Sequence, residues 1–171
     1  MTKEPQLPPR AGPRPRTSTE FPQCQLNQQP IDSQHVDTIL AEALTWPSVL
    51  GEASKISVEG ARALTLDDST AGGPTEAFMV GREFCHVHAQ GDYSLHVALP
   101  VPLAHAAEGA GWAEPQSLVH TGQAPATVVM VYAPRDEAER DVVLGLVRAS
   151  YEFALGPGRH PIAGTRGRQS A

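Results

Sequence analysis

The chain has 171 residues, of which 40% are hydrophobic, 5% aromatic and 19% charged, with 16 prolines, 15 glycines and two cysteines. Cys24 and Cys85 have neither zinc-site nor C-x-x-C spacing, and two cysteines form at most one bridge, which excludes a disulfide framework. The longest apolar run, residues 128–133, is far shorter than the roughly 20 residues that span a bilayer, and no apolar block resembles a signal peptide. We therefore expect a soluble, cytoplasmic protein without membrane association.

The formal charge of -6 is unevenly distributed along the chain. Residues 31–155 carry 17 acidic and 6 basic side chains, whereas residues 1–30 and 156–171 are net basic. Because an acidic domain repels phosphate backbones, we expect no nucleic-acid binding. The expected partner is a small-molecule substrate, and the oligomeric state stays open.

Both ends of the chain are predicted to be disordered. Residues 1–30 contain seven prolines and few aliphatic side chains, so they bury too little surface to offset chain entropy. Residues 156–171 begin with a Gly-Pro turn and continue as a Gly- and Arg-containing tail. The segment between them, 31–155, is predicted to form one domain.

The first predicted element of this domain is an amphipathic helix. It begins at Asp32 or Ser33, has Ile31 stapled onto Val36, and ends at Trp46-Pro47. Alternating hydrophobicity then predicts strands at 55–58, 61–66, 77–80, 84–89 and 94–99. A turn at residues 59–60 is expected to join the first two strands as a hairpin.

The remaining elements complete an α+β order. Residues 103–108 predict a short helix and residues 127–132 an interior strand. Asp136 and Glu139 fit a capping box at the start of a long helix that ends near Leu155. We predict a single α+β domain with an antiparallel sheet of about five to six strands, packed against an N-terminal and a long C-terminal helix, as in YjbR-like folds.

Three histidines are the candidate chemical centre. One face of the predicted strand 84–89 and the residues before it carries Arg82, Phe84, His86 and His88, because alternate residues of a strand share a face. His96 joins them if Leu95, Val97 and Leu99 of the next strand face the core. A three-residue loop at 91–93 is expected to place His88 directly across from His96.

This cluster has three interpretations, which the residues alone leave open. The imidazoles could bind a divalent metal such as Fe, Zn or Cu. Alternatively, one imidazole is a general base towards an acidic enol or phenol while the others donate hydrogen bonds to the developing oxyanion. Finally, the histidines could be half-exposed strand residues without a function.

A longer pattern surrounds these histidines. It comprises Arg-Glu at 82–83, His-x-His at 86–88, Leu-His-x-Ala-Leu at 95–99, Gly-Trp at 111–112, Tyr-Ala-Pro-Arg at 132–135 and Ala-Ser at 149–150. Over residues 82–150 the sequence thereby resembles the fungal luciferase family and its bacterial relatives, the luciferase-domain proteins. The resemblance implies an oxygenase that needs no cofactor beyond molecular oxygen. Fungal luciferases oxygenate 3-hydroxyhispidin, a 2-pyrone that carries a catechol ring.

The resemblance also implies roles for individual residues. His86 or His88 is assigned as the base, His96 as its partner and Arg82 as a clamp for the substrate anion. The candidate substrate-binding residues are Trp112, Tyr132, Arg135 and Gln116. The first two could instead be packing residues, and Arg135 could pair with Glu139 or Asp136.

One departure from the family pattern bears on activity. Gln116 stands where family members commonly have a histidine. Two alternatives to the cofactor-independent oxygenase therefore remain: a non-catalytic small-molecule-binding or regulatory domain on the same scaffold, and a metal-dependent oxygenase with His86, His88 and His96 as ligands.

Overall fold

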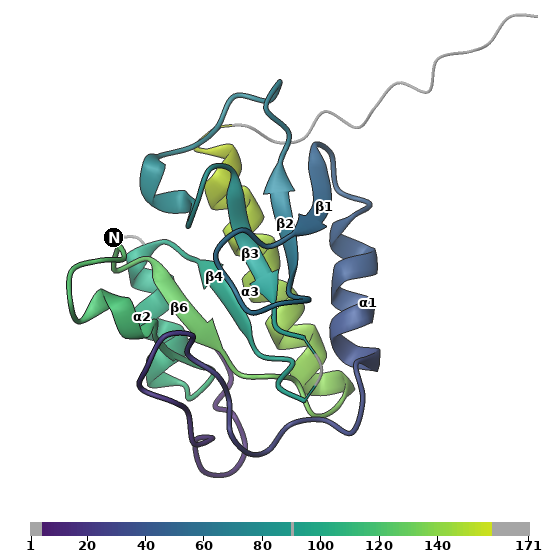
Figure 1. Ribbon diagram of the computed structural model, residues 1–171, viewed down its shortest axis with the longest axis vertical. Helices are drawn as coiled ribbons and strands as arrows, with labels where there is room; N and C mark the ends of the chain where they lie inside the picture. The colour runs from purple at the N-terminus through teal and green to yellow at the C-terminus, as the bar shows by residue number, and fades with distance from the viewer. Residues whose placement is uncertain (1–4, 90, 159–171) are drawn as a thin grey trace, which may run out of the picture.

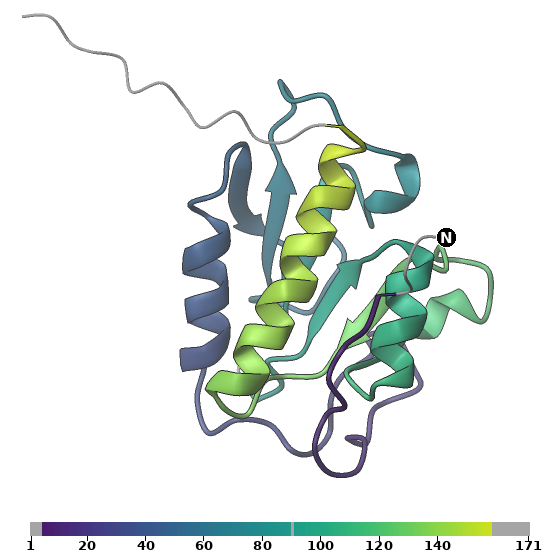
Figure 2. The same cartoon turned by 180° about the vertical axis from the view of Figure 1, so that it is seen from behind.

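The computed structural model describes residues 5–89 and 91–158, and its centre is one six-stranded antiparallel sheet (Figure 1). In spatial order the strands are β1 (Val49–Ala53), β2 (Arg62–Leu66), β3 (Glu83–Val87), β4 (Leu95–Ala98), β6 (Val128–Val131) and β5 (Ala113–Pro115). Helices α1 (Gln34–Ala43) and α3 (Glu137–Leu155) lie side by side across one face, and α2 (Val101–Gly109) packs next to β5 (Figure 2). The predicted α+β fold class is confirmed.

The face of the sheet that meets α1 and α3 forms the hydrophobic core. Strand alternation places Cys85, Val87, Leu95 and Val97 in this core, and all four are fully buried. On the opposite side of the core, α3 contributes the buried stripe Val143, Leu146, Val147, Tyr151 and Ala154. The polar residues that alternate with this apolar set therefore face away from the helices.

The boundaries of α3 follow from its end residues. The Asp136 side chain accepts a hydrogen bond from the N–H of Glu139 at 2.9 Å, which confirms the predicted N-cap. The helix ends at Gly156, whose φ of 84° suits glycine. From residue 159 onward the predicted C-terminal tail lies outside the described residues. Within the described part of the chain, no helix is long and apolar enough to cross a membrane.

The start of α1 differs from the prediction in one detail. Ser33 is the N-cap, but Ile31 is fully exposed and makes no staple onto Val36. Polar contacts occupy this end of the helix instead, because Asp32 accepts from the N–H of Gln34 at 3.0 Å. The helix therefore depends on its buried apolar stripe more than on its N-terminus.

The first predicted strand is wrong. Residues 55–58 form a loop, and the strand that pairs with β2 is β1, which precedes them. The buried carboxylate of Glu83 accepts hydrogen bonds from Ser54 Oγ at 2.9 Å and from the N–H of Lys55 at 3.4 Å. These bonds hold the chain away from the strand ladder.

The other predicted elements have mixed outcomes. The short helix at 103–108 is confirmed as α2, and the interior strand at 127–132 is confirmed as β6, which lies between β4 and β5. The strand predicted at 77–80 is wrong, because this segment holds the end of the 3₁₀ turn η1 (Thr75–Ala77) and a single bridge from Val80 to Glu83. With only one bridge, no ladder forms there.

The N-terminal segment, residues 5–30, packs on the domain, so the prediction of a disordered leader is wrong for these residues. Trp112 Nε1 donates a hydrogen bond to the Pro8 carbonyl at 2.6 Å. The Gln25 side-chain oxygen accepts from the backbone N–H of Ala133 at 2.9 Å. The proline-rich composition indicated correctly that the segment has no hydrophobic core of its own. Side-chain amides such as that of Gln25 nevertheless attach it to backbone groups that the sheet leaves unpaired.

Candidate functional site

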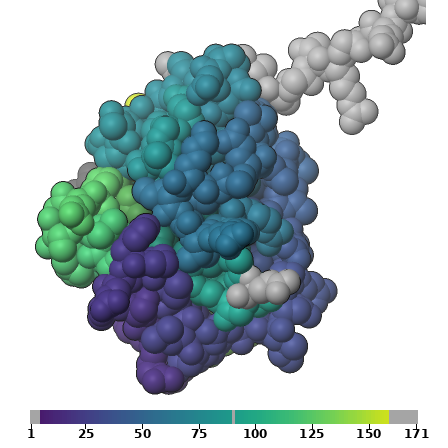
Figure 3. Space-filling view, viewed as in Figure 1, coloured from purple at the N-terminus to yellow at the C-terminus, as the bar shows by residue number. Residues whose placement is uncertain are grey.

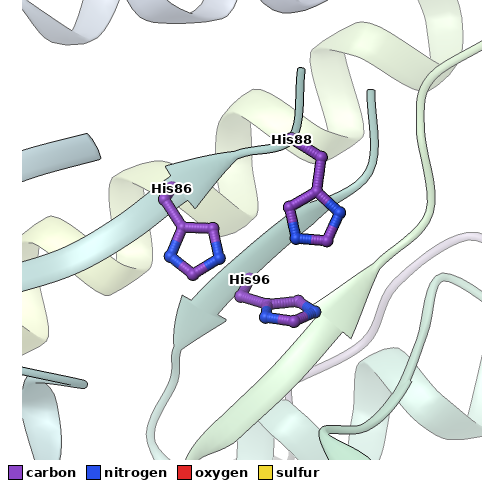
Figure 4. Close-up of side chains that lie close together, drawn as sticks. All are labelled: His86, His88 and His96. Atoms are coloured by element: carbon purple, nitrogen blue, oxygen red, sulfur yellow. The ribbon is translucent and has the colours of Figure 1, made fainter. Parts of the chain in front are cut away.

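The three histidines lie together on the face of the sheet that points away from α3 (Figure 4). His86 of β3 pairs directly with His96 of β4, whereas His88 lies opposite Ser94, whose carbonyl accepts its N–H at 2.9 Å. The predicted pairing of His88 with His96 is therefore wrong by two residues. The face is nevertheless as predicted, because a shift of two residues preserves the alternation. The cause is the connection 89–93, which is five residues long and not three.

The cluster is compact and almost inaccessible to solvent. The ring centroid of His96 lies 4.9 Å from that of His86 and 4.8 Å from that of His88, and the last two rings are 5.5 Å apart. The exposed fractions of His86, His88 and His96 are 2%, 1% and 4%. One ring nitrogen from each residue lies within 4.8 Å of the other two. The interpretation as half-exposed residues without a function does not fit this burial.

A β-bulge supplies the first carboxylate of the site. The register of β2 against β3 shifts between Leu64 and Thr65, so Phe84 packs on Tyr151 in the core while Glu83 reaches the histidine face. Glu83 Oε1 lies 2.6 Å from His86 Nδ1, and both side chains are buried. The prediction that Phe84 shares a face with the histidines is wrong for this reason.

A second carboxylate comes from the β3–β4 connection. Asp92 Oδ2 lies 2.5 Å from His88 Nδ1. Its other oxygen, Oδ1, accepts from Ser94 Oγ at 2.6 Å and from the backbone N–H of Gln25 at 3.2 Å. Glu83 and Asp92, the carboxylates that contact the histidine rings, form the outer layer of the cluster, and the N-terminal segment contacts this layer through Asp92.

These carboxylates fix the protonation pattern of the rings. A carboxylate accepts a hydrogen bond, so His86 and His88 carry their proton on Nδ1 and present a lone pair at Nε2 when neutral. Burial lowers the pKa of His86, although Glu83 acts in the opposite direction. The pKa of His96 is well below its usual value because of burial and, secondly, because His86 and His88 are close. His86 and His96 are therefore neutral at neutral pH, the form that binds metals or accepts protons.

His86 and His96 also line a pocket of about 70 Å³. Gln116 adds a polar group, and apolar side chains such as Ile56 and Met79 form most of the remaining wall. The Gln116 side-chain oxygen accepts from the N–H of Leu118 at 2.6 Å. Figure 3 shows that the N-terminal segment (purple), the loop after β1 (blue) and the segment after β5 (green) cover this face of the sheet.

Arg82 is not part of the histidine cluster, so its side chain is not positioned to bind a substrate anion there. Its guanidinium donates to the carbonyls of Leu66 at 3.3 Å and Asp67 at 3.2 Å, and also to that of Thr70. Three backbone acceptors hold the side chain over the β2–η1 connection. The bulge at Phe84 interrupts the alternation that the sequence prediction assumed.

Three of the four predicted substrate-binding residues lie outside the pocket wall. Trp112 is buried in the core, and Tyr132 donates its hydroxyl to Glu114 Oε2 at 2.9 Å. Burial and Glu114 together raise the pKa of Tyr132 to about 12, so it stays protonated. Arg135 pairs with Glu139, as its structural alternative predicted.

Sequence reasoning missed two residues of the site, Glu83 and Asp92. Glu83 belongs to the Arg-Glu pair of the family pattern, which was a signal, but regular strand alternation assigned it to the wrong face. Asp92 lies in a turn, where an aspartate usually needs no function beyond bonding its own backbone.

The fold and the site define a small α+β protein with a buried cluster of three histidines. Residues 81–150 match a family model described as the luciferase domain. Luciferases of Armillaria mellea, Armillaria ostoyae and Armillaria gallica are each 29% identical to the chain and match 87% of it. The chain spans about 61% of the length of these relatives, and no solved structure matches it. The segment that is similar to the luciferase domain, residues 81–150, contains all three histidines.

Proposed function

We propose that this protein is an oxygenase that adds molecular oxygen to a small enolisable aromatic or pyrone-type substrate at His86, His88 and His96. One observation carries the proposal: three buried imidazoles converge, two of them, His86 and His96, line a mostly apolar pocket, and the Nε2 atoms of all three have no hydrogen-bond partner among the described residues. The resemblance to luciferases supplies the reaction class. An electron-rich ring fits the apolar wall, and its enol oxygen fits the polar edge.

The proposed reaction needs no external reductant. The substrate gives its enol proton to the Nε2 atom of one imidazole, and the N–H formed there donates a hydrogen bond to the enolate oxygen. A carbon–oxygen bond then forms between the enolate carbon and dioxygen, which takes two electrons from the enolate. The proton adds to the terminal oxygen, so the product is a substrate hydroperoxide. Both electrons that reduce dioxygen to the peroxide level therefore come from the substrate.

The size of the pocket restricts how a substrate enters. A volume of about 70 Å³ is well below the roughly 300–1,000 Å³ of typical ligand sites. A substrate with a six-membered ring therefore requires part of the cover to move aside. Phe21, which is 51% exposed, lines the pocket and belongs to the N-terminal segment, so this segment is where we place the entrance.

A second candidate function is a non-catalytic small-molecule-binding domain. Two features favour it: Gln116 lines the pocket at a position where the resemblance to the luciferase family implies a histidine, and the pocket is small. In this case the cluster holds a ligand without changing it.

Oxygen uptake tests the two functions against each other. Purified protein is given a panel of hydroxy-pyrones and catechols in an oxygen electrode, and ligand binding is measured in parallel by calorimetry. We expect substrate-dependent uptake by the wild type and by His105→Ala, an exposed position on α2, and none by the double variant His86→Ala, His88→Ala. Binding without uptake supports the second candidate. Uptake that persists in the double variant contradicts the proposed site.

A further inference from the structure

We infer that His86, His88 and His96 bind one divalent transition-metal ion of the first row through their Nε2 atoms. The inference concerns the same site as the proposed function but replaces its imidazole base, because an ion bound to all three Nε2 atoms leaves none of them free to accept the enol proton. It rests on separate observations, however, and it is measured by binding and not by turnover.

The first observation concerns three buried ring nitrogens. The Nε2 atoms of all three histidines are buried and have no hydrogen-bond partner among the described residues. For His86 and His88 the carboxylates hold the proton on Nδ1, so their Nε2 atoms present lone pairs. Buried polar atoms are nearly always partnered, and lone pairs that face one another in a low dielectric repel. When His96 also carries its proton on Nδ1, the three Nε2 atoms are all acceptors. A water molecule has two hydrogens and cannot satisfy three acceptors, whereas one metal ion accepts three lone pairs.

The second observation is the outer layer of the cluster. Metal-binding histidines commonly donate their other ring N–H to a carboxylate, which orients the ring and makes the ligand nitrogen more basic. Glu83 does this for His86 and Asp92 for His88, at 2.6 Å and 2.5 Å. The two carboxylates also carry two negative charges, which balance a divalent cation among three neutral rings. An isolated base would need only one such partner.

The ligand set limits which ions fit. Imidazole nitrogens suit Zn, Fe, Ni and Cu, whereas Mg and Ca prefer oxygen ligands. Three protein ligands with a fourth position left open are typical of catalytic and not of structural zinc sites. The ring nitrogens lie within 4.8 Å of one another, and a tetrahedral site separates its nitrogens by about 3.3 Å. Binding therefore requires the rings to close in by rotating about their side-chain bonds.

A neighbouring group of possible ligands, Cys24, His88 and Asp92, is the main competitor. Its atoms are already engaged. His88 Nδ1 and Asp92 Oδ2 bond to each other, and Asp92 Oδ1 accepts from Ser94 and Gln25. An ion there would have to displace these bonds, whereas the three Nε2 atoms have no hydrogen bond to the part of the chain that the structure describes.

Equilibrium dialysis with elemental analysis tests the inference on the full chain without a polyhistidine tag. The protein is treated with a chelator and then dialysed against Zn²⁺ or Co²⁺. We expect one ion per chain in the wild type and in the control His105→Ala, and loss of stoichiometric binding in His86→Ala and in His96→Ala. Unchanged stoichiometry in both site variants overturns the inference.

Because alanine at a buried position can unfold the chain, a second measurement uses the wild type alone. Long-range ¹⁵N–¹H spectra of the imidazoles are recorded before and after one equivalent of Zn²⁺. We expect large shifts of three Nε2 signals, and an absence of shifts overturns the inference. Stoichiometric binding without oxygen uptake supports the metal site while contradicting the proposed function. Oxygen uptake in protein that binds no metal has the opposite meaning.

Discussion

Glu83 Oε1 and His86 Nδ1 lie 2.6 Å apart although the two residues are three positions apart along β3. In a regular strand, residues three apart face opposite sides of the sheet. The contact therefore depends on the bulge at Phe84, where the register against β2 shifts. The same carboxylate accepts from Ser54 Oγ, so one irregularity connects the β1–β2 loop to the histidine cluster.

Glu83→Gln tests this relationship. The amide keeps the size of the side chain but removes the charge that favours a proton on His86 Nδ1. We expect the affinity for Zn²⁺ to fall roughly 10- to 100-fold while the stoichiometry stays at one ion, measured by competition with a chromophoric chelator. Glu52→Gln, on the exposed part of β1, is the matched control. An affinity equal to that of the control would show that Glu83 has no influence on the metal.

Gln25→Ala tests whether the N-terminal segment is an integral part of the fold. The substitution leaves the buried N–H of Ala133 without its acceptor, which costs about 1–3 kcal/mol of unfolding free energy. Urea denaturation measures the loss, with the exposed position Gln6→Ala as control. If both variants unfold at the same urea concentration, the segment contributes little to stability.

The two thiols should react slowly in the native state. Burial, together with Asp92, raises the pKa of Cys24 to about 11, and burial raises that of Cys85 as well. Because only the thiolate attacks a disulfide reagent, we expect slow labelling of Cys24 at pH 8 and no labelling of Cys85 until the protein unfolds. Reaction with a chromogenic disulfide, with and without guanidinium, counts the reactive thiols. Two rapidly reacting thiols in the native protein would contradict the burial of Cys85.

Acid should destabilise the protein in the presence of a chelator. The pKa of His96 is lowered on folding, mainly by burial, so the unfolded chain binds more protons below about pH 6.5. This part of the stability is complete above that pH and declines as the pH falls towards the folded pKa. Urea titrations from pH 8 to pH 5 measure the decline, and His96→Met should show a weaker one. An identical profile for both proteins would exclude His96 as the cause.

Much of the fold followed from local patterns. The capping pair at Asp136 predicted the long helix, and alternating apolar residues in β3 and β4 predicted the core face and hence the common face of the histidines. The N-terminal segment could not be predicted in this way. Its attachment depends on single side-chain amides such as that of Gln25, which forms a hydrogen bond with the backbone of a residue far along the chain. Amino-acid composition does not reveal such bonds.

The candidate site was predicted only in its inner layer. Residues 86, 88 and 96 were identified because strand periodicity is local. Arg82 was expected at the cluster and lies away from it, whereas Glu83 was not expected there and contacts His86. The cause is the bulge, which adds one residue to the strand and has no sequence signal that distinguishes it from regular alternation. The length of the β3–β4 connection determines which histidines pair. The sequence could not predict this length, because turns that differ by two residues bury the same apolar side chains.

The most direct test of the central claim is X-ray absorption spectroscopy on the wild-type protein loaded with one equivalent of Zn²⁺. The three-histidine site predicts three imidazole nitrogens at about 2.0–2.1 Å, with the outer scattering of three rings. A sulfur atom at about 2.3 Å, which would come from Cys24, contradicts the assignment, and so does a shell with fewer than three imidazoles.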